Sequence, residues 1–574
     1  MSGNPPAPLS KNELLKQNDP TLGGALAETL ANPALACFPA DDEQFLKFHG
    51  IYQQDDRDKR KTGRQYIMMI RARIPGGIIP PDQYLAFDDL SERYGNQTLR
   101  ITSRQSFQWH GVVKEKLGPL LKGLNDALCT TVAACGDVNR NVMAPATPAA
   151  SALAERVLAD ARRVDAALLP QTAAYHAIWI DGEPLKLPPE EKKQFADPLY
   201  GKTYLPRKFK IAFALPPLND TDVFTNCLGF VAIPDPAEPA RVLGYNLLCG
   251  GGLGMSHGNP DTYPRTADVL GFFAPEEIVN VAQAVLTAYR DSGDRTNRKH
   301  ARLKYVLEER GADWFRGEVE SRAGLKLAPA RPMNFTSQGD LFGWRQQSEG
   351  RWFLGLYVET GRIKDTPQRQ LKTALRRIVA KFRPEVRLTP SQNLLLAGVH
   401  AGQKDGITAL LAEHGIPVEN QAGAIRRASM ACPSLPTCGL GLAESERYLP
   451  ALLEQLEGLL AELGLSDEEI IIRMTGCPNG CARPYMAEIG FVGKAPGKYN
   501  LYLGGNAGTT RLNREYRASV KADDILNELR PPLARWKNER RPGERFGDFC
   551  ARAVLPGQIT QGAAGDAAPA SLST

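Results

Sequence analysis

The spacing of apolar residues along the chain predicts a mixed α/β fold. Apolar positions recur at helical intervals over 82–94, 368–382 and 449–463, and the third stretch places seven leucines on one face. Between such stretches lie short apolar runs with the two-residue period of a strand, for example 68–74. Because helix-like and strand-like stretches alternate, we predict strands and helices packed in common layers.

A long segment with an Arg-x-Thr signature occurs twice in the chain. The two copies share Arg, Thr, Gln, Gly and Val, and one register also aligns a second stretch downstream. A repeat of this length is too long for a solenoid, so we predict two homologous halves about a pseudo-twofold axis. The matched stretches are 99–112 with 386–399, 140–147 with 427–434, and, in another register, 245–251 with 499–505.

Length and composition describe a large folded protein. The 574 residues correspond to about four units of ordinary domain size. With 43% hydrophobic and 23% charged residues, the chain is not largely disordered or collagen-like. A net charge of +6 over this length does not argue for nucleic-acid or membrane binding. Ten cysteines are too few for a disulfide framework, no apolar run is long enough to span a bilayer, and no leader-like segment is evident, so we predict a cytoplasmic protein.

Four cysteines form two close pairs that proline and glycine keep out of helices. Five residues separate Cys432 from Cys438, and three separate Cys477 from Cys481. These spacings favour an iron–sulfur cluster over a structural zinc site or buried inert thiols, which remain the alternatives. We predict that the other six are ordinary core residues: Cys37, Cys129, Cys135, Cys227, Cys249 and Cys550.

Several cations interrupt stretches that are otherwise apolar. Arg71 and Arg73 share one face of the predicted strand over 68–74, and Lys208 and Lys210 share a face of another. Any one of them fits an ordinary surface side chain. Together they predict a bound polyanion or small oxyanion, because burying an unpartnered charge costs several kcal/mol. Further cations in apolar surroundings are Arg100, Arg104 and Arg140.

These features resemble the siroheme-containing sulfite and nitrite reductases, over about residues 45–550. The two cysteine pairs are similar to that family's cluster signature, and the second reads Cys477-Pro-Asn-Gly-Cys481. Residues 48–58 (FHGIYQQDDRD) and 203–210 (TYLPRKFK) look like the hemoprotein (beta) subunits of the NADPH-dependent assimilatory enzymes. The resemblance implies an internally duplicated fold with ferredoxin-like halves.

On this resemblance we divide the chain into five parts. The expected parts are an N-terminal partner-docking arm over 1–60, which orders on a partner, paired ferredoxin-like half-domains over 61–135 and 330–420, a siroheme and substrate domain over 136–329, a 4Fe-4S and siroheme domain over 421–555, and a disordered tail over 556–574.

The resemblance also implies roles for individual residues. Cys432, Cys438, Cys477 and Cys481 would hold a 4Fe-4S cluster, and Cys481 would also ligate the siroheme iron. The sulfite oxyanion would be bound by Arg71, Arg140, Lys208 and Lys210. Contacts to siroheme, with its eight carboxylates, are expected from Arg100, Arg104, Gln108, Arg207 and Lys304. For Arg207 and Lys208 to face the same ligand, the backbone near Pro206 must be irregular.

The implied activity is the six-electron reduction of sulfite to sulfide in sulfate assimilation and cysteine biosynthesis. The chain shows no flavin or nicotinamide motif, so electrons are expected from a partner flavoprotein (alpha) subunit that carries FAD and FMN and oxidises NADPH. The nearest alternative is a ferredoxin-dependent sulfite or nitrite reductase. A more distant one is a zinc-stabilised nucleic-acid-binding protein, against which the cations argue because they interrupt apolar strands and form no exposed stripe.

Overall fold

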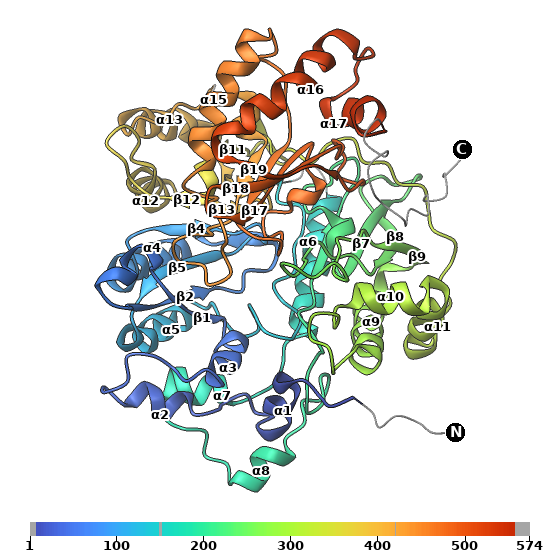
Figure 1. The fold of residues 1–574 in the computed structure, drawn as a ribbon. Coiled ribbons are helices and arrows are strands. Elements are labelled where there is room, and N and C mark those ends of the chain that lie inside the picture. The colour runs from blue at the N-terminus through green and yellow to red at the C-terminus, as the bar shows by residue number, and fades with distance from the viewer. Residues whose placement is uncertain (1–6, 149–151, 420, 557–574) are drawn as a thin grey trace.

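Four β-sheets with covering helices make up the chain, in a computed structural model that describes residues 7–148, 152–419 and 421–556 (Figure 1). The predicted mixed α/β class is confirmed. Two five-stranded sheets form the ferredoxin-like halves. The strand order of the first sheet is β1 (Ile51–Asp55), β2 (Tyr66–Arg71), β5 (Phe107–Val112), β4 (Leu99–Ile101) and β12 (Arg362–Ile363). The strand order of the second sheet is β10 (Gly343–Gln346), β11 (Trp352–Leu356), β14 (Leu394–Val399), β13 (Glu385–Leu388) and β3 (Ile78–Ile79).

The two halves exchange a short strand. β3 comes from the first half but pairs with β13, and β12 comes from the second half but pairs with β4, both antiparallel. Four helices cover these sheets: α4 (Pro81–Tyr94), α5 (Leu117–Asp126), α12 (Leu371–Phe382) and α13 (Lys404–Glu413). α4 and α12 confirm two predicted helices. α12 begins later than expected because Thr366 and Arg369 close a turn through mutual backbone hydrogen bonds.

In each of the other two sheets, the strands at one edge pair in parallel and the remaining strands pair antiparallel. Their orders are β6 (Ile211–Ala214), β7 (Leu228–Pro234), β8 (Val242–Cys249) and β9 (Asp268–Phe273), and β15 (Ser429–Ala431), β16 (Ile472–Thr475), β17 (Ile489–Ala495), β18 (Lys498–Leu503) and β19 (Arg514–Lys521). The longer helices outside them are α6 (Ala152–Ala167), α9 (Ile278–Ser292), α10 (Leu303–Arg310), α11 (Ala312–Ala323), α15 (Leu449–Glu462) and α16 (Ile525–Glu539).

The predicted leucine-rich helix is α15, and all six leucines within it are buried. It packs against β16, β17 and α16 in the core of the C-terminal sheet. Shorter helices are α7 (Ala174–His176), α8 (Pro189–Gln194), α14 (Ala424–Arg427) and α17 (Phe546–Phe549). No helix among the described residues is both long and apolar enough to cross a membrane.

Matched hydrogen bonds reveal the internal duplication. Gln105 and Gln392 occupy equivalent turns, both in the left-handed region, with φ of 53° and 70°. The side-chain oxygen of Gln105 accepts from the Ala144 N–H at 3.0 Å, and that of Gln392 accepts from the Ala431 N–H at 3.2 Å. Each half therefore uses the same turn to hold the segment that leads into its larger sheet.

The N-terminal segment is folded against its own chain, and its role as a partner-docking arm stays a prediction. Helices α1 (Lys11–Asn18), α2 (Leu26–Ala31) and α3 (Asp42–Phe48) precede β1, which pairs with β2 (Figure 1). Some charges of this polar segment are buried: Lys16 is ion-paired with Glu13 and donates to the Leu205 carbonyl at 2.9 Å. The predicted disordered tail lies, from residue 557 on, outside the described residues.

Candidate active site

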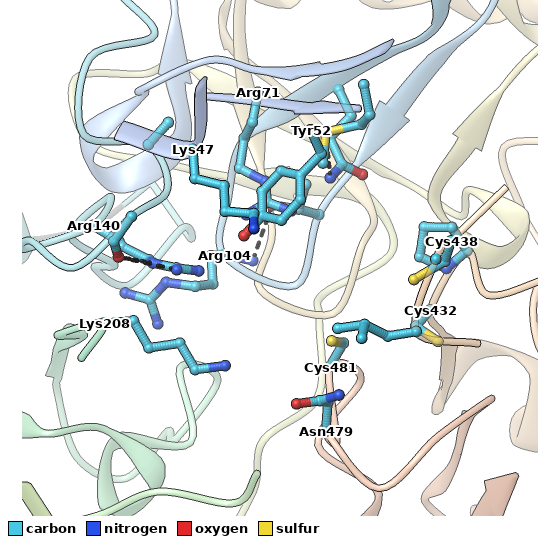
Figure 2. Close-up of a pocket in the computed structure, with 18 of the residues that line it drawn as sticks. Lys47, Tyr52, Arg71, Arg104, Arg140, Lys208, Cys432, Cys438, Asn479 and Cys481 are labelled. Atoms are coloured by element: carbon cyan, nitrogen blue, oxygen red, sulfur yellow. Dashed lines mark hydrogen bonds between the residues drawn. The ribbon is translucent and has the colours of Figure 1, made fainter. Parts of the chain in front are cut away.

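A cavity of 590 Å³ lies between segments of both halves (Figure 2). Figure 2 shows cysteines on one side of it and cations on the other. All eight residues predicted as cluster ligands and substrate-binding cations line this cavity: Cys432, Cys438, Cys477, Cys481, Arg71, Arg140, Lys208 and Lys210. Residues far apart in the sequence therefore face one space.

Two of the cations are anchored by uncharged acceptors. Arg71 is the last residue of β2, and its Nη1 donates to the sulfur of Cys135 at 3.1 Å. Arg140 donates from Nε and Nη2 to the Gly136 carbonyl, at 3.2 and 3.1 Å. Neither guanidinium forms an ion pair with a described residue. These contacts orient the two groups and leave their positive charge available to a ligand.

The two lysines lie on an irregular segment just before β6. Tyr204 has a left-handed backbone, with φ of 52°, and regular pairing starts only at Ile211. This irregularity confirms the expectation near Pro206, since Arg207 and Lys208 both line the cavity. The irregular backbone lets neighbouring side chains face the same space.

The ammonium groups of Lys208 and Lys210 have neither a hydrogen bond nor an ion pair within the described part of the chain. Burial lowers the pKa of Lys208 well below its usual range, and the positive charge of Lys210 lowers it further. The pKa of Lys210 is lowered in the same way by burial and then by Arg104. An anionic ligand beside these two ammonium groups would favour their charged forms.

The cysteine loops start at neighbouring strand ends. Cys432 follows β15, and Cys477 and Cys481 follow β16, to which β15 is parallel. Parallel strands bring their carboxyl ends to one edge, so the two loops meet there. Backbone hydrogen bonds fix them: the Cys432 N–H donates to the Met474 carbonyl at 3.2 Å, and the Cys438 N–H donates to the Ser434 carbonyl at 2.9 Å.

The four thiols also interact electrostatically. Burial, and then the neighbouring Cys481, raises the pKa of Cys477 to about 11, and the same causes raise the pKa of Cys432 and Cys438. Thiols that oppose one another's ionisation favour a bound cationic group, which stabilises all the thiolates together. Among the described residues, no three His, Cys, Asp or Glu side chains converge on a single metal ion. The donor set fits a cluster that thiolates hold around a shared space.

Two family models match this chain. The Nitrite and sulphite reductase 4Fe-4S domain covers residues 159–327 and 422–555, and the Nitrite/Sulfite reductase ferredoxin-like half domain covers 59–127 and 345–414. The chain belongs to the nitrite and sulphite reductase family. The half domain matches once in each half of this reductase, and the two matched segments are the ones that exchange β3 and β12.

Relatives cover nearly the whole reductase chain. Proteins named sulfite reductase [NADPH] hemoprotein beta-component occur in Myxococcus xanthus (strain DK1622), 49% identical over 96% of this chain and 97% of the relative, and in Geobacillus kaustophilus (strain HTA426), 47% identical over 97% and 98%. The solved Mycobacterium tuberculosis NirA protein shares the fold, with a TM-score of 0.76, 24% identity, and coverage of 95% of this chain and 97% of that one. The predictions of family, fold and an oxidoreductase with siroheme and a 4Fe-4S cluster are confirmed.

Three of the predicted siroheme contacts line the reductase cavity: the cations Arg104 and Arg207, and the uncharged Gln108. Arg104 donates to the Asn226 side chain at 2.9 Å and to two backbone carbonyls. Burial, and then Arg140, lowers the pKa of Arg104 to about 9. The Nη1 of Arg207 lies 3.7 Å from the Asp137 carboxylate, which is a long ion pair. A polycarboxylate in the cavity would supply carboxylate partners for these guanidinium groups.

Other cations chosen from the sequence have partners within the chain. Arg73 does not share the environment of Arg71, because its Nε and Nη2 each bind Asp165 at 2.8 Å in the core. Arg100 reaches the cavity wall but is ion-paired with Glu446 at 2.9 Å. Lys304 is not among the residues that line the cavity, and its Nζ donates to the backbone carbonyls of a glycine-rich loop.

Several further residues line the site that were not predicted from the sequence. Arg302, two positions before Lys304, lines a smaller cavity of 20 Å³ together with Lys208, Lys210 and Cys481. Lys47 and Tyr52, from α3 and β1, project toward the main cavity (Figure 2). Tyr52 lies within the FHGIYQQDDRD stretch, so that motif was the available signal for it. Nothing in the Arg302-Leu-Lys304 run distinguishes the two cations.

Proposed function

We propose that this chain reduces sulfite to sulfide as the hemoprotein subunit of a two-component enzyme, with electrons from an NADPH-oxidising flavoprotein that carries FAD and FMN. The observation that carries the proposal is one cavity lined by four cysteines and by four cations that have no anionic partner among the described residues. The relatives named as the beta-component of an NADPH sulfite reductase support a separate flavoprotein subunit. None of the ten cysteines forms a disulfide, which supports a cytoplasmic location.

The residues of the cavity divide into cofactor-holding and substrate-binding groups. Cys432, Cys438, Cys477 and Cys481 would hold the cluster, and Cys481, the exposed member that faces the cavity, would be shared with the siroheme iron. When bound, the siroheme and cluster would provide the redox chemistry that passes the flavoprotein's electrons to sulfite. Arg104, Gln108 and Arg207 would pair with siroheme carboxylates, as bidentate arginine contacts allow.

The substrate-binding cations would neutralise sulfite and supply protons. The balanced reaction is SO3²⁻ + 6 e⁻ + 8 H⁺ → H2S + 3 H2O, so each oxygen must leave as water. Arg71 and Arg140 stay charged and fix the oxyanion. Lys208 and Lys210 are the proton donors, because burial has lowered the pKa of both and made proton release easier. Solvent protons then restore the ammonium groups.

The absorption spectrum and metal content of the purified protein test this proposal. We expect a coloured protein with siroheme and four cluster irons per chain, and sulfide production from sulfite with reduced methyl viologen. A colourless protein with one zinc per chain would overturn the reductase assignment. Parallel assays with the flavoprotein plus NADPH and with reduced ferredoxin identify the donor, and nitrite in place of sulfite measures the substrate preference.

A further inference from the structure

Lys304 is a fully buried lysine whose partners are backbone carbonyls. It lies in the first turn of α10, and its Nζ donates to the carbonyls of Gly252 at 3.2 Å, Gly254 at 3.1 Å and Tyr263. The Nζ also lies 4.8 Å from the centroid of the Tyr305 ring. An ammonium group has three donors, and three carbonyls accept from this one. The side chain is therefore fully engaged by its own chain.

The two glycine carbonyls belong to a glycine-rich loop, residues 250–255, which follows β8. This loop packs so closely that its glycines are required. A Cβ at residue 251 would lie 2.2 Å from the Phe224 carbonyl oxygen, and a Cβ at residue 252 would lie 3.3 Å from Lys304 Cδ. The glycines therefore let the loop pass directly against the Lys304 side chain.

The glycine-rich loop also contacts the cysteine segment 477–481 of the second half. The Met255 N–H donates to the Pro478 carbonyl at 2.9 Å. A Cβ at residue 254 would lie 3.3 Å from the Asn479 carbonyl oxygen, so the two backbones are in close contact there. Both contacts fall between the two cysteines of this segment. A loop of the first half thus fixes the backbone beside two of the proposed cluster ligands.

We propose that Lys304 is a positioning residue for the 4Fe-4S cluster, because it fixes the glycine-rich loop and that loop fixes the segment 477–481. The inference rests on the proposed role of the two cysteines in that segment as cluster ligands. Lys304 acts through two successive contacts: its Nζ binds the Gly254 carbonyl, and the N–H of the next residue binds the Pro478 carbonyl. Outer contacts that orient metal ligands commonly contribute about 10- to 100-fold to metal affinity.

The surroundings of Lys304 differ from those of its neighbour Arg302. Arg302 lines the smaller cavity beside Cys481, and its Nε has no hydrogen-bond partner among the described residues. Lys304 lines neither cavity, because its Nζ is turned to the loop carbonyls. Arg302 is therefore open to a ligand in the cavity, whereas Lys304 supports the backbone. A direct siroheme contact by Lys304 would require its carbonyl bonds to break.

The variant Lys304→Met tests the inference, because methionine fills the buried space and removes the donors. The matched control is Lys114→Met. Lys114 is also buried, and its Nζ donates to the carbonyls of Thr29 at 3.0 Å and Asn32 at 2.6 Å, both in the N-terminal segment. Both variants should lower the melting temperature, since each leaves buried carbonyls without a donor.

Iron release from the purified full-length protein separates the two variants. We expect Lys304→Met to lose cluster iron to a chelator about tenfold faster than the wild type, and Lys114→Met to lose it at the wild-type rate. The KM for sulfite and the turnover per remaining cluster should be unchanged in Lys304→Met, because the substrate-binding cations are intact. Hydrogen exchange should become faster over 250–255 and 477–481 in Lys304→Met alone. If that variant is insoluble, Lys304→Gln, which keeps a shorter donor, should show smaller changes in the same direction.

The outcomes separate this inference from the proposed function. Wild-type iron release and wild-type exchange over 477–481 in Lys304→Met would overturn the inference and leave the reductase assignment intact. Equal iron release from the Lys304 and Lys114 variants would indicate general destabilisation, which also overturns it. Loss of siroheme with the cluster iron retained would show a direct siroheme contact instead. A purified wild-type protein without iron would defeat the proposed function, and exchange over 477–481 would then still decide whether Lys304 fixes this segment.

Discussion

At the scale of single residues, we expect Lys208 to matter for turnover and not for stability, because its ammonium has no anionic partner in the described part of the chain. Its pKa is lowered by burial and by Lys210, so its positive charge destabilises the folded chain until an anion binds. We expect Lys208→Met to cut sulfite turnover by about 10²-fold or more, the usual scale of a lost proton donor. Siroheme and iron content should remain. Steady-state assays together with the absorption spectrum measure both effects.

The matched control for this position is Lys202→Met, an exposed lysine on the same segment. It should change neither turnover nor cofactor content. The cofactor-free Lys208→Met protein should also melt at a temperature no lower than the wild type, since a partly buried amine with no anionic partner among the described residues is removed. Normal turnover in Lys208→Met would remove this lysine from the catalytic group.

At the scale of elements, the equivalent turns of the two halves support different segments. Gln392 donates to the Ala431 carbonyl at 2.9 Å and accepts from its N–H, directly before Cys432. We expect Gln392→Ala to weaken cluster retention roughly thirtyfold, because two bonds of about 1 kcal/mol are lost. Gln105→Ala removes the equivalent bond to Ala144, where no cysteine follows.

Iron content per folded chain and thermal melting distinguish the two glutamine variants. Gln105→Ala should lower the melting temperature and keep its iron, since its turn supports only the fold. Gln392→Ala should lose iron during a chelator challenge. Equal iron loss in both variants would show that these turns do not differ in function.

The sequence predicted elements and ligand types better than it predicted charge partners. The cysteine spacings and the duplicated Arg-x-Thr strands are local patterns, and they identified residues that now share one cavity. Arg71 and Arg73 look alike in the sequence, but only Arg73 meets an aspartate, Asp165, from a helix far along the chain. Such long-range pairs are set by tertiary packing, so no local pattern distinguishes a ligand-binding arginine from a structural one.

At the scale of the whole molecule, the duplicated halves contribute different chemistry to one site. Arg71, Arg140 and the lysines come from the first half, and the cysteines come from the second. Pro145 stands in the first half where the second has Cys432, so the first half cannot supply that ligand. The activity therefore depends on the two halves remaining packed together.

A buried ion-pair network joins the halves. Asp222 precedes β7 and Arg483 precedes β17, the equivalent strand, and both have left-handed backbones, with φ of 46° and 56°. The Asp222 carboxylate binds Arg483 Nε at 2.6 Å and also binds Arg473, and all three side chains are buried. Arg483 further donates to the Ser103 and Pro390 carbonyls, both at 3.0 Å, one from each half.

We expect Asp222→Asn to destabilise the folded protein by about 3–5 kcal/mol, because two buried guanidinium groups lose their counter-charge. Glu539→Gln, which breaks an exposed helical pair with Arg535, should cost only about 0.3–0.5 kcal/mol. Denaturant unfolding of both variants beside the wild type measures the difference. Equal shifts would show that the network does not hold the halves together.

The pH dependence gives the Asp222 network a second test. Burial alone would raise the pKa of Asp222, but Arg473 and Arg483 outweigh it and lower the pKa. The stability that this carboxylate contributes is therefore fully present above its unfolded pKa, near 4, and is lost as the pH falls through its lower folded value. The stability gap between wild type and Asp222→Asn should accordingly narrow in acid below about pH 4 and stay constant from about pH 5 to 8. A gap that instead widens in acid would contradict a charged Asp222 at the contact between the halves.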